Sequence, residues 1–141
     1  MDSSVLVASL TPDDKDYTAC DALLSQTGNW ISSHALNETF ATLTGGRLGL
    51  RVDAEVAAMM IRESIVPSVS FVDLSVDEIV EAQRSARQKG VRGGSVYDYM
   101  HLLAARKAGA ESLYTLNLGD FRHLHRPGDP EIKHPSKSNV L

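Results

Sequence analysis

Four places along the chain put a carboxylate or an amide near the start of a helix or the end of a strand. They are Asp2, Glu38, Asp98 and the turn from Asn117 to Asp120. Mg²⁺ and Mn²⁺ prefer oxygen ligands, often a few carboxylates completed by water. Carboxylates crowded into one cleft repel one another unless a cation compensates their charge. Together these residues predict a site for one or two divalent ions, which would activate a water for phosphodiester cleavage.

Asp98 is the acid that most needs an explanation, because the segment around it is apolar. The pattern predicts a helix over residues 96–108 that is apolar almost all the way round, and such a helix is normally buried. Ser95 followed by Asp98 predicts a capping box, and Gly109 predicts the end of the helix. From the residues alone, Asp98 is either a helix cap or a metal or catalytic ligand.

Helical and extended patterns alternate along the rest of the chain. Helices are predicted over residues 14–26, 33–44, 53–64, 76–89 and 96–108, and strands over residues 30–32, 69–74, 111–116 and 131–133. The apolar run 5–10 fits either a short helix or a strand. Ser33 and Asp53 are predicted caps, and Ser75 with Glu78 forms a capping-box pattern. The alternation predicts an α/β layered domain with a mostly parallel sheet, in which ligands collect at the carboxyl ends of the strands.

Composition limits the classes of protein that the chain can belong to. Its 141 residues and 43% hydrophobic content predict one globular domain with a sizeable core. The net charge of −4 argues against a general nucleic-acid-binding surface but allows an enzyme whose acidic site is filled by cations. A single cysteine, Cys20, excludes an intrachain disulfide framework and a multi-cysteine zinc site. With neither a membrane-length apolar run nor a signal-peptide pattern, we expect a cytoplasmic protein.

Four motifs, in order, resemble those of PIN domains. Residues 2–8 (DSSVLVA) resemble the opening D-[ST]-[SN]-x-L-[VI], and Ile31-Ser32 followed by Leu36-Asn37-Glu38 resembles the second motif. Residues 97–110 resemble the D-x-x-[IL]-A-A-x-A segment, and residues 113–121 resemble the T-x-N-x-x-D-F motif common in VapC-type toxins. The resemblance covers essentially the whole chain to about Lys133.

This resemblance implies a three-layer α/β/α PIN-like fold with a short central parallel sheet over residues 1–134. It also implies a Mg²⁺- or Mn²⁺-dependent endoribonuclease, the toxin of a type II toxin–antitoxin pair. Such toxins are commonly homodimers that a VapB-like antitoxin inhibits, and they meet DNA only through the antitoxin. No contact with a membrane is implied. Residues 135–141 are expected to be a flexible C-terminal tail.

The resemblance also assigns roles to the acids. Asp2, Glu38 and Asp98 match the first three family acids and would ligate metal or orient the attacking water. Asn117 stands where many relatives carry a fourth acid, and Asp120 would supply that carboxylate or a bond to the inner ligands.

The sequence departs from the family at two places, and serines beside the first acid extend the motif set. Family members carry apolar residues before the first acid, which form the central strand, whereas Met1 alone precedes Asp2 here. Ser3 or Ser4 is expected to hydrogen-bond within the acidic cluster. The neutral Asn117 predicts a weaker second metal site and keeps open a catalytically inactive PIN-like interaction module.

Other residues have simpler interpretations. His101 is expected to be a partnered core histidine that could approach the site. Cys20 and Trp30 are expected in the core, with stacking on an RNA base as the alternative role of Trp30. The remaining histidines are interpreted as surface residues: His34, His123, His125 and His134. Four cations are solvated charges or contacts to RNA phosphates or an acidic antitoxin segment: Arg47, Arg51, Lys89 and Arg92. A receiver-like Mg²⁺-binding signalling module is a further alternative, with Asp73 accepting phosphate, but no lysine follows the strand ending at Leu116.

Overall fold

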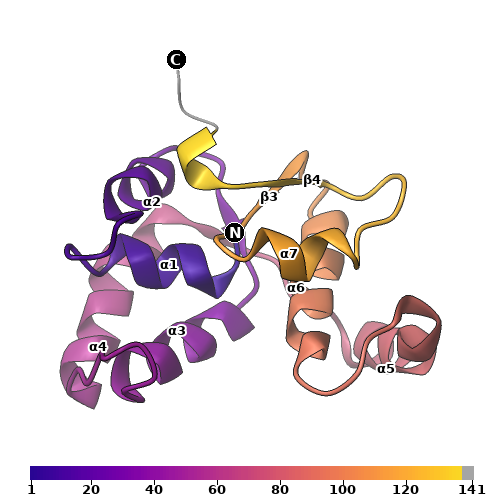
Figure 1. Ribbon diagram of the computed structural model, residues 1–141, viewed down its shortest axis with the longest axis horizontal. Coiled ribbons are helices and arrows are strands. Elements are labelled where there is room, and N and C mark those ends of the chain that lie inside the picture. Colours follow the sequence, from indigo (N-terminus) through magenta and orange to yellow (C-terminus); the bar gives the residue numbers. More distant parts are fainter. Residues whose placement is uncertain (138–141) are drawn as a thin grey trace.

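The fold is described by a computed structural model that covers residues 1–137 (Figure 1). The helices are α1 (Ser3–Ser9), α2 (Tyr17–Leu24), α3 (His34–Thr44), α4 (Ala54–Met60), α5 (Val76–Ser85), α6 (Ser95–Lys107) and α7 (Leu118–Arg122). The strands are β1 (Trp30–Ile31), β2 (Ser70–Phe71), β3 (Ser112–Tyr114) and β4 (Glu131–Lys133). A π-helical turn, η1 (Ile61–Ile65), continues α4, and 3₁₀ turns form η2 (Val66–Ser68), η3 (Ala86–Lys89) and η4 (Pro135–Lys137). The chain therefore has the mixed helix and strand content expected of an α/β protein.

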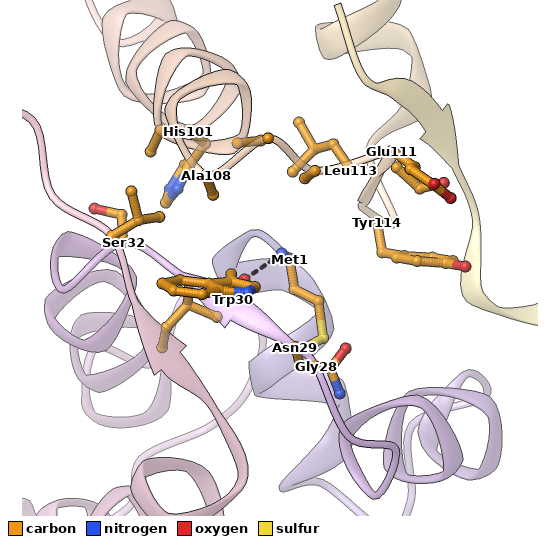
Figure 2. Close-up of a pocket in the computed structure, with 17 residues that line it drawn as sticks. Met1, Gly28, Asn29, Trp30, Ser32, His101, Ala108, Glu111, Leu113 and Tyr114 are labelled. Atoms are coloured by element: carbon orange, nitrogen blue, oxygen red, sulfur yellow. Dashed lines mark hydrogen bonds between the residues drawn. The ribbon is translucent and has the colours of Figure 1, made fainter.

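The strands form two separate parallel pairs, β1 with β2 and β3 with β4. The start of the chain lies between the two pairs. The Met1 amino group donates a hydrogen bond to the Trp30 carbonyl at 2.9 Å, and the Asp2 N–H donates to the Tyr114 carbonyl at 3.1 Å. Burial lowers the pKa of this amino group to about 6, although the nearby Asp2 charge opposes the shift. The predicted parallel pairing is present, and these two residues hydrogen-bond to both pairs, as Figure 2 shows for Met1 and Trp30.

Local capping patterns predicted some helix starts and misjudged others. The capping box of Ser75 and Glu78 is present, and the Asp53 side chain accepts the Glu55 N–H at 2.9 Å. The predicted capping box at Ser95 is wrong, because the Ser95 hydroxyl bonds the backbone of Arg92 instead and Gly94 occupies the cap position. The ambiguous run 5–10 is helical, and the predicted strand 69–74 shortens to the two exposed residues of β2.

The middle of helix α6 is buried around most of its circumference, as expected, whereas residues of its first and last turns are exposed. Tyr99, Leu102 and Ala104 are buried, whereas Tyr97 is 50% exposed. One side of the core joins α1–α4 with β1, and the other joins α5, α6, β3 and α7. In Figure 1 the N-terminus lies near the centre of the view, between α1 and α7.

Three further expectations concern the core, the C-terminus and membranes. Cys20 is fully buried as predicted, but Trp30 is 43% exposed and the prediction that it packs in the core is wrong. Pro135 is buried and η4 contacts α2, while residues 138–141 of the predicted tail lie outside the described residues. Among residues 1–137, no helix is both long and apolar enough to span a membrane.

Candidate active site

A cleft of about 500 Å³ opens where α1, α3, α6 and the turn after β3 meet. Asp2 lies at the start of α1, Glu38 on α3, Asp98 on the first turn of α6, and Asn117 at the start of α7. All four line the cleft, so the structure brings together four of the five residues that the sequence singled out. The fifth, Asp120, is exposed on α7 and does not line the cleft, but its charge acts on Asp98.

Asp2 is fixed in place by two hydroxyl groups. One carboxylate oxygen accepts a hydrogen bond from Ser4 at 2.6 Å, and the other accepts one from Thr115 at 2.9 Å. The side chain is buried, and burial raises the pKa of this carboxyl against the opposing effects of the Ser4 bond, the His101 charge and the Thr115 bond. A buried carboxylate with both oxygens bonded keeps a single orientation toward its neighbours.

The Ser4 and Thr115 hydroxyls also connect α1 to the turn after β3. Ser4 Oγ accepts the Leu116 N–H at 2.9 Å, and Thr115 Oγ1 accepts the Asn117 N–H at 2.9 Å. The predicted role of a serine in the cluster is therefore confirmed for Ser4. Thr115 was not singled out from the sequence, although it is the threonine of the T-x-N motif, and that motif position could have identified it.

Glu38 lies between two histidines. Its Oε1 is 2.5 Å from Nε2 of His101 and 3.6 Å from Nε2 of His34, and its Oε2 accepts a 3.4 Å bond from Ser3. Burial would raise the pKa of Glu38, but the hydrogen bond and charge of His101, with the charge of His34, hold it below its ordinary value. Glu38 is therefore ionised at neutral pH and directed into the site.

His101 is the partnered core histidine that the sequence predicted, with Glu38 as its partner. His34 is predicted as a surface residue and its side chain is 44% exposed, but its Nε2 atom is buried and faces Glu38. Its ring also stacks on Tyr97, with ring centroids 5.1 Å apart. The i, i+4 spacing of His34 and Glu38 on α3 could have indicated this contact.

Four acids line the cleft, Asp2, Asp14, Glu38 and Asp98, and Asp98 is the least constrained of them. Among the described residues, no hydrogen bond or ion pair engages its carboxylate, and it does not cap α6. Burial raises the pKa of Asp98 to about 6, and the negative charges of Asp2, Asp120 and Glu38 add to the shift while His101 opposes it. The cap interpretation therefore loses its support, and the cleft has an excess of negative charge at Asp98.

The donor set suits a hard divalent ion, although no preformed cage is present. Within residues 1–137, no group of three or more His, Cys, Asp or Glu side chains is gathered closely enough to hold a metal ion. The cleft offers carboxylate and amide oxygens, which Mg²⁺ and Mn²⁺ prefer, and Mg²⁺ commonly keeps several waters and uses only one or two carboxylates. A cation would also relieve the repulsion that raises the pKa of Asp98.

Two other charged residues considered from the sequence lie in different places relative to this cleft. Of the four cations considered as RNA contacts, Arg47 lines the cleft and is exposed. Asp73, the acceptor in the receiver-like alternative, instead accepts the Ser33 N–H at 2.8 Å and lines another pocket. The phosphate acceptor of the receiver-like alternative therefore does not line the cleft that the other acids line.

Comparison of the chain with protein-family models and with curated protein sequences finds no match. The interpretation of the cleft therefore depends on its own geometry and on the motifs in the sequence. Those two lines agree in one respect, because Asp2, Glu38 and Asp98 come from three separate motifs and line one cleft. Their convergence is the main fact that a functional proposal has to explain.

Proposed function

We propose that this chain is a Mg²⁺- or Mn²⁺-dependent endoribonuclease of the PIN-domain, VapC type. The observation that carries the proposal is Asp98, a carboxylate that lines an acidic cleft and whose pKa is raised to about 6 by burial and neighbouring acids. A divalent cation would remove that penalty and make the cleft attractive to a phosphodiester. The proposed fold is the three-layer α/β/α arrangement of that family.

In the proposed mechanism a bound Mg²⁺ or Mn²⁺ supplies Lewis-acid activation of water and neutralises charge on the scissile phosphate. Asp98 and Glu38 would hold the ion, and Asp2 would bind it or one of its waters. His101 keeps Glu38 ionised and oriented through their 2.5 Å contact. Arg47, exposed at the cleft, would contact an RNA phosphate.

The biological setting is proposed from the sequence motifs. The chain would act in the cytoplasm as the toxin of a type II toxin–antitoxin pair and would form a homodimer. A VapB-like antitoxin would inhibit it by inserting its tail into the cleft, with contact to DNA only through that antitoxin.

The test is cleavage of RNA by the purified, antitoxin-free protein in Mg²⁺, Mn²⁺ or EDTA. We expect cleavage that EDTA abolishes and that Asp98→Asn reduces by at least about 100-fold, the scale of a lost charge-stabilising group. Asp21→Asn, which changes an exposed acid on α2, is the matched control and should keep full activity. Cleavage that is indifferent both to EDTA and to Asp98→Asn would overturn the proposal. Metal binding without cleavage would instead support the inactive PIN-like module.

A further inference from the structure

A second pocket, of about 380 Å³, lies beside the acidic cleft and is formed by the start of α3, the segment after β2, α5 and the first turns of α6. In Figure 1, α6 lies between α3 and α5. Most of the pocket wall is apolar and includes Leu74, Ile79, Val96 and Met100. An apolar wall with a few polar groups is typical of a site for a small organic ligand. We call this space the side pocket.

A pair of stacked rings connects the side pocket to the acidic cleft. His34 and Tyr97 both line the side pocket, with ring centroids 5.1 Å apart and ring planes inclined by 21°. The Nε2 atom of His34 lies 3.6 Å from Glu38, which lines the cleft. Tyr97 directly precedes Asp98, which also lines the cleft. A nucleic-acid strand with a phosphate in the cleft would therefore bring a neighbouring base to these rings.

Tyr97 is suited to stacking on such a base. His34 covers one face of its ring, yet half of the residue surface remains exposed. Proteins commonly hold the bases of single-stranded RNA by stacking them on aromatic rings. The side chains of Val96 and Met100, next to the ring in the pocket wall, would cover the rest of a flat base that is turned out of the strand.

The charge of the side pocket favours a neutral base over a phosphate. The Asp73 carboxylate lines the pocket, and no lysine or arginine is among the described residues of its wall. A phosphate there would be repelled by Asp73 without a lysine or arginine to compensate. The base is the uncharged part of a nucleotide, so it is the part that this pocket can accept.

Two polar groups in the side pocket have unused hydrogen-bonding capacity. Asp73 Oδ1 accepts the Ser33 N–H at 2.8 Å, while Oδ2 has no hydrogen-bond partner within residues 1–137. In the same part of the chain, no hydrogen bond engages the amide of Gln83. A carboxylate can accept two adjacent N–H donors, and an amide N–H can donate to a carbonyl oxygen. Guanine alone among the RNA bases presents two adjacent donor groups, N1–H and the 2-amino group, beside the O6 acceptor.

We propose that the side pocket binds an unpaired guanine base of an RNA strand that lies in the acidic cleft. Tyr97 stacks on the base, Asp73 accepts hydrogen bonds from N1–H and the 2-amino group, and Gln83 donates to O6. This inference rests on the proposed ribonuclease function, which supplies the RNA strand. It adds to that function the base that the enzyme selects beside the phosphate in the cleft.

The test uses trinucleotides that carry a single base on the middle sugar and uncharged methylphosphonate linkages. These probes contain no phosphodiester, so they are not cleaved and need no metal. Binding to the 141-residue protein is followed by NMR through the methyl groups of Ile79 and Met100. We expect the guanine probe to shift both signals and to bind at least about tenfold more tightly than a probe without a base. It should also bind about tenfold more tightly than a hypoxanthine probe, which lacks the 2-amino group.

Three variants assign the parts of this binding. Tyr97→Ala should weaken binding of the guanine probe by about tenfold, whereas Tyr97→Phe keeps the ring and should retain most of the affinity. Asp73→Asn should remove the preference for guanine over hypoxanthine but leave the stacking contribution. Asp77→Asn, which changes an exposed acid of α5 that lines a different pocket, is the matched control and should bind like the unchanged protein.

Equal affinity for the guanine probe and the probe without a base would overturn the inference. So would a guanine affinity that Tyr97→Ala does not change, provided circular dichroism shows that the variant is folded. Tighter binding of N-acetyl-arginine amide than of the guanine probe would also overturn it, because a cationic side chain of a partner protein would then be the occupant.

The outcome is separate from that of the RNA cleavage assay. Guanine binding by a protein that cleaves no RNA would count against the nuclease activity alone. Cleavage of RNA without guanine binding would count against the side pocket alone.

Discussion

Replacing Asp98 by asparagine should stabilise the metal-free protein while abolishing the proposed activity. Burial and neighbouring acids raise the pKa of Asp98 from 3.8 to about 6. At 1.36 kcal/mol per pKa unit this corresponds to about 3 kcal/mol of destabilisation above pH 6. Because the side chain is only half-buried, solvent screening reduces the figure to about 1–2 kcal/mol. Asparagine has the same shape and removes the charge that causes the penalty.

The sign of the effect depends on pH in a defined way. A carboxyl whose pKa is higher in the folded than in the unfolded state costs its full penalty above the folded value and none below the unfolded value. Thermal unfolding at pH 7.5 in EDTA should therefore show a Tm for Asp98→Asn about 3–6 °C above that of the unchanged protein. The difference should shrink as the pH falls through 6 toward 4.

Divalent metal should reverse the order of stability. An ion that binds the folded, ionised site stabilises it by about 2.7 kcal/mol at 100 times its Kd, and Asp98→Asn should lose most of that gain. Asp21→Asn, exposed on α2, should show neither effect. A lower Tm for Asp98→Asn at pH 7.5, or a difference that does not change with pH, would refute the electrostatic account of the cleft.

Three further substitutions test the groups around the acids. His101→Ala leaves Glu38 without its 2.5 Å partner and should cost about 1–3 kcal/mol in urea unfolding at pH 7. Because the pKa of Glu38 is lowered in the folded protein, this loss should fade as the pH falls below the pKa of a glutamate in the unfolded chain. Thr115→Val removes the 2.9 Å bond to Asp2 and should lower the free energy of unfolding by about 1–3 kcal/mol. RNA cleavage should fall by more than this loss of stability explains. Unchanged cleavage in a folded variant would contradict the role of Thr115 in positioning Asp2. Arg47→Ala should weaken RNA binding and reduce the salt-dependence slope by about 1, whereas a slope equal to that of the unchanged protein would exclude a phosphate contact.

Local patterns predicted most helices because a helix start depends on neighbouring residues. Ser75 and Glu78 form their capping box because each finds its partner three residues away. Ser95 and Asp98 have the same spacing, but the turn before α6 offers the Arg92 backbone to the Ser95 hydroxyl at 2.8 Å. Spacing alone does not decide between two such partners. Because Ser95 bonds the Arg92 backbone and forms no capping box with Asp98, the Asp98 carboxylate is available to the cleft.

Contacts between segments that are distant in the sequence could not be predicted from local residue patterns. The contact of Glu38 with His101 joins residues 63 positions apart and depends on how α3 and α6 pack. The bond from Thr115 to Asp2 joins positions 113 apart across the turn after β3. Motif order identified the acids and a serine beside the first of them, but the Thr115 bond to Asp2 and the contact of His34 with Glu38 were not predicted. The exposure of the first turn of α6 has the same origin, since Tyr97 stacks on His34 instead of entering the core.

The position of the first acid depends on backbone bonds to both strand pairs. Asp2, which lines the acidic cleft, donates its N–H to the Tyr114 carbonyl, and the Met1 amino group beside it donates to the Trp30 carbonyl. These two bonds hold the start of α1 between β1 and β3. The geometry of the cleft therefore depends on how the two strand pairs are placed, and not on α1 alone.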